Sequence, residues 1–252
     1  MLSASNSRIF VVMRYYLIIL FVFAASTKAL ATPADSVLDS YRHFIMPTAK
    51  PVEGGYLGFW ELGFLQGGYG FGDVLSLSGG FTILPTVAFR SQFAFLQGKL
   101  TFVDDDQGLS LAGGLNYLRL TSDNTLLHLF GALTYETPNE TRFTGLIFYK
   151  IYGSTIYGSN STLVTVNVVP YGAFTFNYTG GLGAGLGFDT PLAGNPHVRF
   201  VGEIWNHDLS DPTALGIIGA LRLESQNFSS DFGFMYFTLP LLAPVANFVW
   251  RF

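Results

Sequence analysis

Residues 196–206, with the sequence PHVRFVGEIWN, decide the fold of this chain. Successive side chains of a β-strand point to opposite faces, so a strand with one apolar face shows a period of two. The two faces consist of Val198, Phe200, Gly202 and Ile204 on one side, and His197, Arg199, Val201 and Glu203 on the other. The stretch therefore predicts a strand with one apolar face and one face that carries charge.

The same alternation recurs along most of the chain from Gly55 onward, in segments separated by turn residues. We expect about twelve strands, with ten and fourteen as alternatives. One source of this range is the stretch 161–178, which contains Pro170 and is long enough for two strands. The expected strand starts are Gly55, Asp73, Thr86, Gln107, Asn124, Thr141, Ser161, Gly181, Pro196, Thr213, Ser229 and Pro244. The glycine-rich stretch 67–72 is interpreted as a turn.

The composition separates a membrane barrel from a soluble β-protein. Charged residues make up 12% of the chain, whereas an average globular domain has about 25%. A soluble sandwich or lipocalin would carry many Lys and Glu on its polar face, but here that face is mostly Gly, Ser, Thr, Ala and Asn. In lipid every backbone polar group must pair, which a closed barrel achieves. We therefore predict an all-β fold, a single up-and-down antiparallel transmembrane β-barrel over residues 54–252.

Residues 1–31 have the order of a secretory signal peptide. Two arginines precede an apolar stretch over residues 15–25, and Ala29-Leu30-Ala31 forms a small-x-small cleavage site. Cleavage is expected after Ala31, with Met13 as an alternative start. An uncleaved anchor helix is the other interpretation, but the apolar run is shorter than the about 20 residues that span a membrane. The order predicts export from the cytoplasm.

Residues 32–53 are expected to form a periplasmic N-terminal segment ahead of the barrel. Apolar residues between Val37 and Ile45 fall on one helical face, and Pro47 would end a helix. A short amphipathic helix at the barrel mouth is one interpretation. A disordered lead-in is the other.

The chain ends with Asn247-Phe248-Val249-Trp250-Arg251-Phe252. Aromatic residues at alternate positions, with Phe at the end, resemble the C-terminal signal of bacterial outer-membrane β-barrel proteins. The motif itself covers only the last strand, and the rest of the mature chain shares only the general alternating pattern of such proteins. It implies that the barrel-assembly machinery reads this strand and that the protein resides in the cell outer membrane. It also implies that Phe248, Trp250 and Phe252 face lipid, while Asn247 and Arg251 face inward.

The strand periodicity also predicts which charged residues face the lumen. They are Glu61, Arg90, Lys99, Arg142, Lys150, Arg199, Glu203, Arg222, Glu224 and Arg251, seven basic and three acidic. If the lumen holds water, this excess of positive charge would favour small anionic solutes. Alternatively, Arg199–Glu203 and Arg222–Glu224 pair with each other and fill a narrow interior.

Other candidate sites carry less chemistry. Asp104-Asp105-Asp106 could bind a hard cation, but the stretch lacks a spaced ligand loop and is better explained as a solvated hairpin tip. The loop His207-Asp208-Leu209-Ser210 holds the residue types of a hydrolase triad, although neighbours in a loop rarely have triad geometry. His128 and His197 are single histidines. The chain has no cysteine and a net charge of −4, so we expect no thiolate metal site, no cofactor and no nucleic-acid partner.

These observations favour a porin-like outer-membrane protein without catalysis. The leading hypothesis is a narrow pore or a structural membrane protein with a mildly basic lumen, in contact with outer-membrane lipid. About twelve strands enclose less space than the 16–18 strands of large porins. The alternatives are a surface-interaction barrel with binding loops and a lipid-modifying outer-membrane enzyme.

Overall fold

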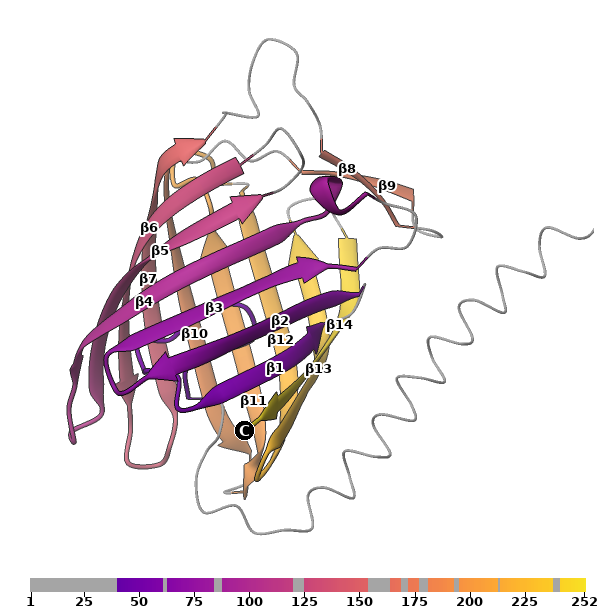
Figure 1. Cartoon of the computed structure of the whole chain (residues 1–252). Coiled ribbons are helices and arrows are strands. Elements are labelled where there is room, and N and C mark those ends of the chain that lie inside the picture. The colour runs from indigo at the N-terminus through magenta and orange to yellow at the C-terminus, as the bar shows by residue number, and fades with distance from the viewer. Residues whose placement is uncertain are drawn as a thin grey trace, which may run out of the picture.

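The computed structural model describes residues 40–60, 63–83, 88–119, 125–153, 164–168, 172–176, 181–192, 195–212, 214–237 and 241–252. Twelve antiparallel strands form one closed barrel, and a two-stranded sheet lies at one end of it (Figure 1). The barrel strands are β1 (Gly55–Trp60), β2 (Phe64–Phe71), β3 (Leu75–Thr82), β4 (Ala94–Asp104), β5 (Leu109–Arg119), β6 (Thr125–Glu136), β7 (Arg142–Gly153), β10 (Leu182–Leu192), β11 (Asn195–Asn206), β12 (Leu215–Ser225), β13 (Phe228–Phe237) and β14 (Leu241–Arg251). The additional sheet consists of β8 (Val164–Val168) and β9 (Gly172–Phe176).

The first and last strands of the barrel close the ring. β1 pairs with β14 in antiparallel register, with Tyr56 opposite Arg251 and Phe59 opposite Phe248. On its other side β1 pairs with β2. Each barrel strand therefore has two neighbours, so the described wall exposes no long unpaired edge to lipid.

The two ends of the barrel differ in the length of their connections. Short turns at residues 72–74, 105–108 and 226–227 lie at the end where β14 finishes, whereas β7 and β10 are joined by residues 154–181 at the opposite end. Figure 1 shows β8 and β9 at that opposite end, away from the C-terminus. Outer-membrane barrels have short periplasmic turns and longer extracellular loops. The end that contains the C-terminus is accordingly the periplasmic end.

The predicted number of barrel strands is confirmed, but one barrel strand was not expected and one expected strand is not part of the barrel. The stretch 67–72 was predicted as a turn, and this is wrong because Gly67 to Phe71 lie in β2. The glycines of this stretch make room for neighbouring side chains instead of forming a turn. A Cβ on Gly68 would lie 2.4 Å from the ring of Tyr56, so β2 needs a residue without a side chain there. The strand expected from Ser161 does not join the barrel, since its described residues form the separate β8–β9 sheet.

The wall has an apolar outer face and a polar inner face, as the alternation predicts. On β11 and β12, Ile204 and Leu221 are 40% and 46% exposed, whereas their chain neighbours Glu203 and Arg222 are 3% and 0% exposed. Inward-facing side chains of a small closed barrel are covered, so the exposed apolar residues are the ones that face outward. Among the described residues, no helix is long and apolar enough to cross a membrane.

The described residues ahead of β1 lie inside the barrel. Residues 40–53, called the plug segment below, contain a tight hairpin in which the His43 N–H donates to Met46 O (2.9 Å) and the Thr48 N–H to Tyr41 O (3.0 Å). The segment contains no helical turn. Residues 32–39, the other part of the predicted periplasmic segment, lie outside the described residues. The described part lies within the lumen rather than beneath the barrel.

Candidate functional site

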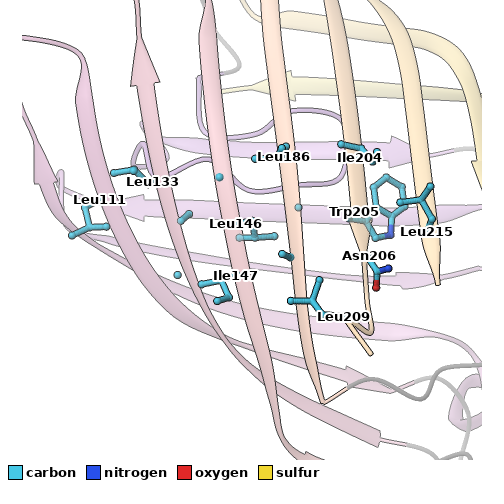
Figure 2. Close-up of a pocket in the computed structure, with 15 residues that line it drawn as sticks. Leu111, Leu133, Leu146, Ile147, Leu186, Ile204, Trp205, Asn206, Leu209 and Leu215 are labelled. Atoms are coloured by element: carbon cyan, nitrogen blue, oxygen red, sulfur yellow. The ribbon is translucent and has the colours of Figure 1, made fainter. Parts of the chain in front are cut away.

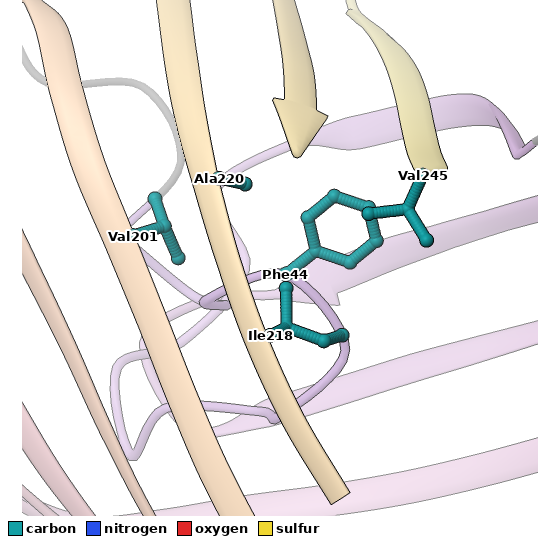
Figure 3. Packing of buried hydrophobic residues seen from close by; sticks show 5 residues of the cluster. All are labelled: Phe44, Val201, Ile218, Ala220 and Val245. Carbon is teal, nitrogen blue, oxygen red and sulfur yellow. The ribbon is translucent and has the colours of Figure 1, made fainter. Parts of the chain in front are cut away.

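The tip of the plug segment packs into the middle of the lumen. Phe44 is 4% exposed and packs with buried, inward-facing residues of the three strands β11, β12 and β14 (Figure 3). The buried members of this cluster are Val201, Ile218, Ala220 and Val245, and Trp60, Trp205 and Met235 pack against it. Burial of a phenylalanine side chain contributes about 2 kcal/mol. The tip is therefore anchored by apolar contact with wall residues that lie far from it in the sequence.

Both ends of the plug segment contact the wall near the periplasmic end of the barrel. Tyr41 and Val52 form a buried cluster with Tyr56 at the start of β1 and Val249 near the end of β14. The rings of Tyr41 and Tyr56 lie 4.9 Å apart, and the guanidinium of Arg251 lies 5.1 Å from the centre of the Tyr41 ring. The segment thus enters and leaves the lumen on the periplasmic side.

Wall side chains satisfy the buried backbone N–H groups of the plug segment. Glu203 Oε1 accepts from the N–H of Ile45 (2.7 Å) and of Met46 (2.9 Å). Across the lumen, the Ala49 N–H donates to Thr134 Oγ1 at 2.8 Å. A buried N–H without a partner would destabilise the folded state, so these wall residues hold the segment in one position.

The carbonyl groups of the plug segment accept hydrogen bonds from the wall as well. Lys99 Nζ donates to Thr48 O at 2.9 Å and also to Lys50 O. Arg222 Nη2 donates to His43 O at 2.5 Å. Lys99 and Arg222 are 3% and 0% exposed. Carbonyl groups of the plug segment therefore accept hydrogen bonds from two buried, positively charged side chains.

An ion pair also ties the plug segment to the wall. Arg42 Nη1 lies 2.7 Å from Asp231 Oδ2, and both side chains are buried. Asp231 is shared, because Arg222 Nε donates to its other oxygen at 2.6 Å. A second pair is more exposed: Lys50 Nζ lies 3.4 Å from Asp104 and 3.1 Å from Glu136.

A second buried carboxylate joins three arginines of the wall. Asp189 on β10 contacts Arg142 at 3.3 Å and Arg222 at 3.2 Å, and it also accepts a hydrogen bond from Arg199 Nε. All four side chains are fully buried. No plug residue takes part in these three pairs. These three ion pairs therefore connect barrel strands to one another and do not depend on the plug segment.

The structure places the predicted lumen charges as follows. Lys99, Arg142, Arg199, Glu203, Arg222 and Glu224 are buried inside, and Lys150 and Arg251 are partly exposed. Arg90 was expected in the lumen, which is wrong, because it is exposed in η1 (Phe89–Ser91), a 3-10 turn between β3 and β4. Glu61 lies outside the described residues.

Two acidic lumen residues were missed, and they change the ion pairs. One interpretation paired Arg199 with Glu203 and Arg222 with Glu224. In the structure, Arg199 forms ion pairs with Asp189 and Glu140, and Arg222 with Asp189 and Asp231. Both aspartates occupy inward positions of the two-residue period, so strict parity along β10 and β13 would have found them. Their presence reduces the expected excess of positive charge.

The extracellular half of the lumen is different in character. Its inward-facing residues, called the outer lumen below, include Trp60, Phe64, Phe95, Gln97, Asn116, His128, Phe148, Lys150 and Trp205, all close to the extracellular ends of their strands. Most of them are partly exposed, whereas the charged residues near the periplasmic end are buried. Solvent therefore reaches the outer lumen.

Two apolar grooves lie on the outside of the barrel. Their volumes are about 690 and 790 Å³, and they share Leu133, Gly145, Leu186 and Ile204. Figure 2 shows the lining residues of the first on β5, β6, β7, β10 and β11. Leu133 and Leu186 are 50% and 66% exposed, so the grooves belong to the outer apolar surface. This surface suits contact with outer-membrane lipid.

The candidate catalytic and metal residues do not form such sites. Ser210 Oγ donates to Asp208 Oδ1 at 2.5 Å, whereas a triad needs the serine hydroxyl to donate to the histidine. Asp105 accepts from two backbone N–H groups of its own turn, as in a hairpin tip. His128 is buried beside Phe148, and His197 lies near the start of β11. No cluster of three metal-ligating side chains occurs within the described ranges.

The C-terminal residues lie on the faces that the resemblance implied. Trp250 and Phe252 are 48% and 81% exposed on the outside of the barrel. Phe248 has the same parity but is covered, with its ring 5.5 Å from that of Phe232. Asn247 faces inward and its Nδ2 lies 3.4 Å from Asp231 Oδ2.

The fold is that of known outer-membrane porins. No protein-family model matches the chain, and no curated protein matches it. The structure "KdgM porin" covers 79% of this chain and 97% of its own, with a TM-score of 0.51 and 8% identity. "KdgM porin in complex with disordered oligogalacturonate" gives a TM-score of 0.50 with 8% identity over the same shares.

A NanC porin is also similar, with a TM-score of 0.45 and 10% identity over 79% of this chain and 98% of its own. The solved structures that reach a TM-score of 0.5 are porins by name. A closed twelve-stranded barrel with an apolar outer surface and a porin fold is a protein of the outer membrane.

Proposed function

We propose that this protein is a narrow channel of the outer membrane and that the plug segment holds the channel closed. The observation that supports this most is the distribution of plug contacts around the wall. Hydrogen bonds or ion pairs from the segment reach β3, β4, β6, β7, β11, β12 and β13. Van der Waals contacts with Gly185 on β10 and with Val249 on β14 add to them.

The plug can leave without dismantling the wall. The segment is joined to the barrel only ahead of β1, and both of its ends are on the periplasmic side. The pairs of Asp189 with Arg142, Arg199 and Arg222 involve wall residues alone. Water that enters the lumen would hydrate the polar groups that the plug leaves behind, so an open state carries no unpaired buried charge.

We propose small anionic solutes as the cargo. Withdrawal of the plug would release the donors of Lys99 and Arg222 that now bind plug carbonyl groups. Lys150 faces the outer lumen in addition. The similar KdgM porin was solved with oligogalacturonate, which is anionic. Asp189 and Asp231 limit the positive excess, so the preference for anions is expected to be mild.

Planar-bilayer recording tests the channel. Purified, refolded protein without residues 40–53 is expected to show discrete conductance steps, and a KCl gradient is expected to give a reversal potential on the anion side. The matched control lacks residues 32–39 and keeps the plug segment. Absence of steps from several correctly folded preparations would remove the pore, and a cation-side reversal potential would remove the anion preference.

Targeting and assembly belong to the same proposal. We infer that residues 1–31 direct export and that Phe248, Trp250 and Phe252 form the assembly signal for the barrel-assembly machinery. The exposed rings of Trp250 and Phe252 at the end of β14 support this role. Deletion of Phe252 is expected to lower the yield of heat-modifiable barrel in membranes, whereas Phe234→Ala, on the exposed face of β13, should not.

A further inference from the structure

Glu203 on β11 is 3% exposed, and its described partners are backbone groups of the plug segment rather than a cation. Its Oε1 accepts from the N–H of Ile45 at 2.7 Å and from that of Met46 at 2.9 Å. Its Oε2 has no hydrogen-bond partner among the described residues. Arg222 on the neighbouring β12 forms its ion pairs with two aspartates instead. The carboxylate therefore faces only peptide N–H groups.

Lys99 on β4 is the counterpart of Glu203 on the other side of the lumen. Around the ring, β4 and β11 are separated by four strands on one side and by six on the other, so they lie on nearly opposite walls. Lys99 is also 3% exposed, and its Nζ donates to Thr48 O at 2.9 Å and to Lys50 O. The nearby Asp104 forms an ion pair with Lys50 Nζ. A carboxylate and an ammonium group thus hold the same plug backbone from two sides.

Hydroxyl groups of the wall bind the plug backbone as well. The Ala49 N–H donates to Thr134 Oγ1 at 2.8 Å, and Ala49 O accepts from Thr101 Oγ1 at 3.0 Å. The Val52 N–H donates to Ser76 Oγ at 3.0 Å. These bonds are made to N–H and C=O groups that nearly every peptide unit has, whatever its side chain. The wall therefore recognises a peptide main chain.

The two charges exceed what a fixed segment needs. Buried N–H and C=O groups require partners in any fold, but neutral groups such as the hydroxyls of Thr101 and Thr134 satisfy them. Burial of a charge without an ion pair is unfavourable, and within the described ranges neither Glu203 nor Lys99 forms one. Both are better suited to a ligand with an ammonium group at one end and a carboxylate at the other.

We propose that the lumen at the level of the plug segment is a binding site for short peptides, which the plug segment occupies in the closed channel. The amino terminus of the peptide pairs with Glu203 and its terminal carboxylate pairs with Lys99. Its internal peptide groups bind the hydroxyls of Thr101 and Thr134. A peptide gains charge-assisted hydrogen bonds at both ends, which the neutral backbone of the plug segment does not offer.

The inference rests on the proposed channel and names one class of carboxylate-bearing solute for it. The peptide and the plug segment compete for the same wall groups, so peptide binding favours the open state. The apparent affinity for the peptide is reduced by the fraction of protein in which the plug segment occupies the site. A change that weakens the plug and leaves the wall intact therefore strengthens peptide binding.

Tryptophan fluorescence reports displacement of the plug, because Trp60 and Trp205 pack against the cluster at its tip. Of the three tryptophans, the exposed Trp250 is replaced by phenylalanine. Full-length mature Trp250→Phe protein in detergent is titrated with trialanine, N-acetyl-trialanine, trialanine amide and glutarate. We expect a saturable change with trialanine and about tenfold weaker binding of the other three. No saturable change with trialanine, or an equal affinity for glutarate, would overturn the proposal.

Competition with the plug is tested by Arg42→Met in the same background. Arg42 belongs to the plug segment, and its buried ion pair with Asp231 is lost while Glu203 and Lys99 stay in place. The affinity for trialanine is expected to increase about tenfold. The matched control is Lys50→Met, which removes a more exposed ion pair and should increase the affinity about threefold or less. Unchanged affinity in folded Arg42→Met protein would show that the peptide does not compete with the plug.

Ratios of affinities isolate the two charged wall residues, because a change in plug stability cancels between two ligands of one variant. The preference for trialanine over N-acetyl-trialanine is expected to fall from about tenfold to about twofold or less in Glu203→Gln. Lys99→Met should remove the preference over trialanine amide in the same way. Asp106→Asn, at the exposed hairpin tip, should keep both preferences. Unchanged ratios in variants that still shift on heating in a detergent gel would contradict the assignment, and if neither variant folds, the ratios of the parent decide.

The outcome distinguishes this inference from the channel itself. Trialanine binding by a protein whose plug-deleted form does not conduct would refute the channel and leave the site. Conductance by the plug-deleted form with no trialanine binding would refute the site and leave the channel.

Discussion

The two halves of the lumen use their side chains in opposite ways. Near the periplasmic end, Asp189 and Asp231 are fully buried and bound by arginines of the wall and of the plug segment. Near the extracellular end, Phe148, Lys150 and Trp205 are partly exposed. The charged side chains of the periplasmic half are thus used in internal ion pairs, whereas these three side chains of the extracellular half are only partly covered.

The difference shows that the two halves hold the plug segment in different ways. A buried ion pair gains little net stability but fixes geometry, so a charged inner half is suited to holding a segment in one place. Near the extracellular end the plug tip is held by apolar contacts instead, since Trp60 and Trp205 pack against the cluster around Phe44.

Removal of residues 40–53 should have the largest effect, because all plug contacts are lost at once. Mean conductance per reconstituted protein is expected to rise about tenfold or more over the intact chain. The deletion of residues 32–39 serves as the control. Equal conductance of the two deletions in the bilayer would show that the plug segment does not close the lumen.

Asp189→Asn should destabilise the barrel most among single substitutions. It removes the carboxylate that joins Arg142, Arg199 and Arg222, and breaking a buried pair costs about 3–5 kcal/mol. Urea unfolding followed by the heat-modifiable gel band measures the loss. Asp106→Asn at the exposed hairpin tip should stay within about 0.5 kcal/mol of the parent. Similar shifts for both variants would contradict the buried network.

Arg42→Met should open the channel more often than Lys50→Met. The pair of Arg42 with Asp231 is buried, whereas Lys50 and its partners are each partly exposed. We expect an increase in opening frequency of about tenfold for Arg42→Met and of about threefold or less for Lys50→Met. The reverse order in single-channel records would place the main anchor of the plug elsewhere.

Gly187→Ala should loosen the plug tip to a smaller degree. The new Cβ would lie 2.5 Å from Cδ2 of His43 and push the imidazole away from Thr144, with which Nε2 now forms a 2.8 Å hydrogen bond. Opening events are expected to become about threefold more frequent. Gly145→Ala adds the same methyl group where nothing lies within 4 Å, and it should leave gating unchanged.

Lys150→Gln should have the smallest effect, on selectivity alone. In the plug-deleted protein, the ratio of anion to cation permeability is expected to fall about twofold. Arg90→Gln removes the same charge from the exposed turn η1 and should leave the ratio unchanged. An effect of Arg90 as large as that of Lys150 would support the original lumen assignment of Arg90.

The period of two correctly predicted which side chains face inward on most of the wall strands. It placed Arg199, Glu203, Arg222 and Glu224 inside, because parity along a strand is a local property of the backbone. It failed at Arg90, which follows the end of β3 and lies in a 3-10 turn where parity has no meaning. It also read the glycines of β2 as a turn, although they make room for Tyr56 and Val52.

The plug segment could not have been predicted from its own residues. Its partners lie far along the chain: Arg42 and Asp231 are 189 positions apart, and Ile45 and Glu203 are 158 apart. A helical face was a fair interpretation of residues 37–45 in isolation. Tyr41 and Phe44 instead pack against the inner wall of the barrel, which no local pattern encodes.

The most direct test of the plug is a reversible lock. The chain has no cysteine, so Ala49→Cys and Ala132→Cys, which replace buried alanines of one cluster, introduce a single possible disulfide. In the Arg42→Met background, we expect conductance after reduction and none after oxidation, with single-cysteine variants indifferent to both. Equal conductance of the reduced protein and of a fully cross-linked protein would contradict closure of this barrel by residues 40–53.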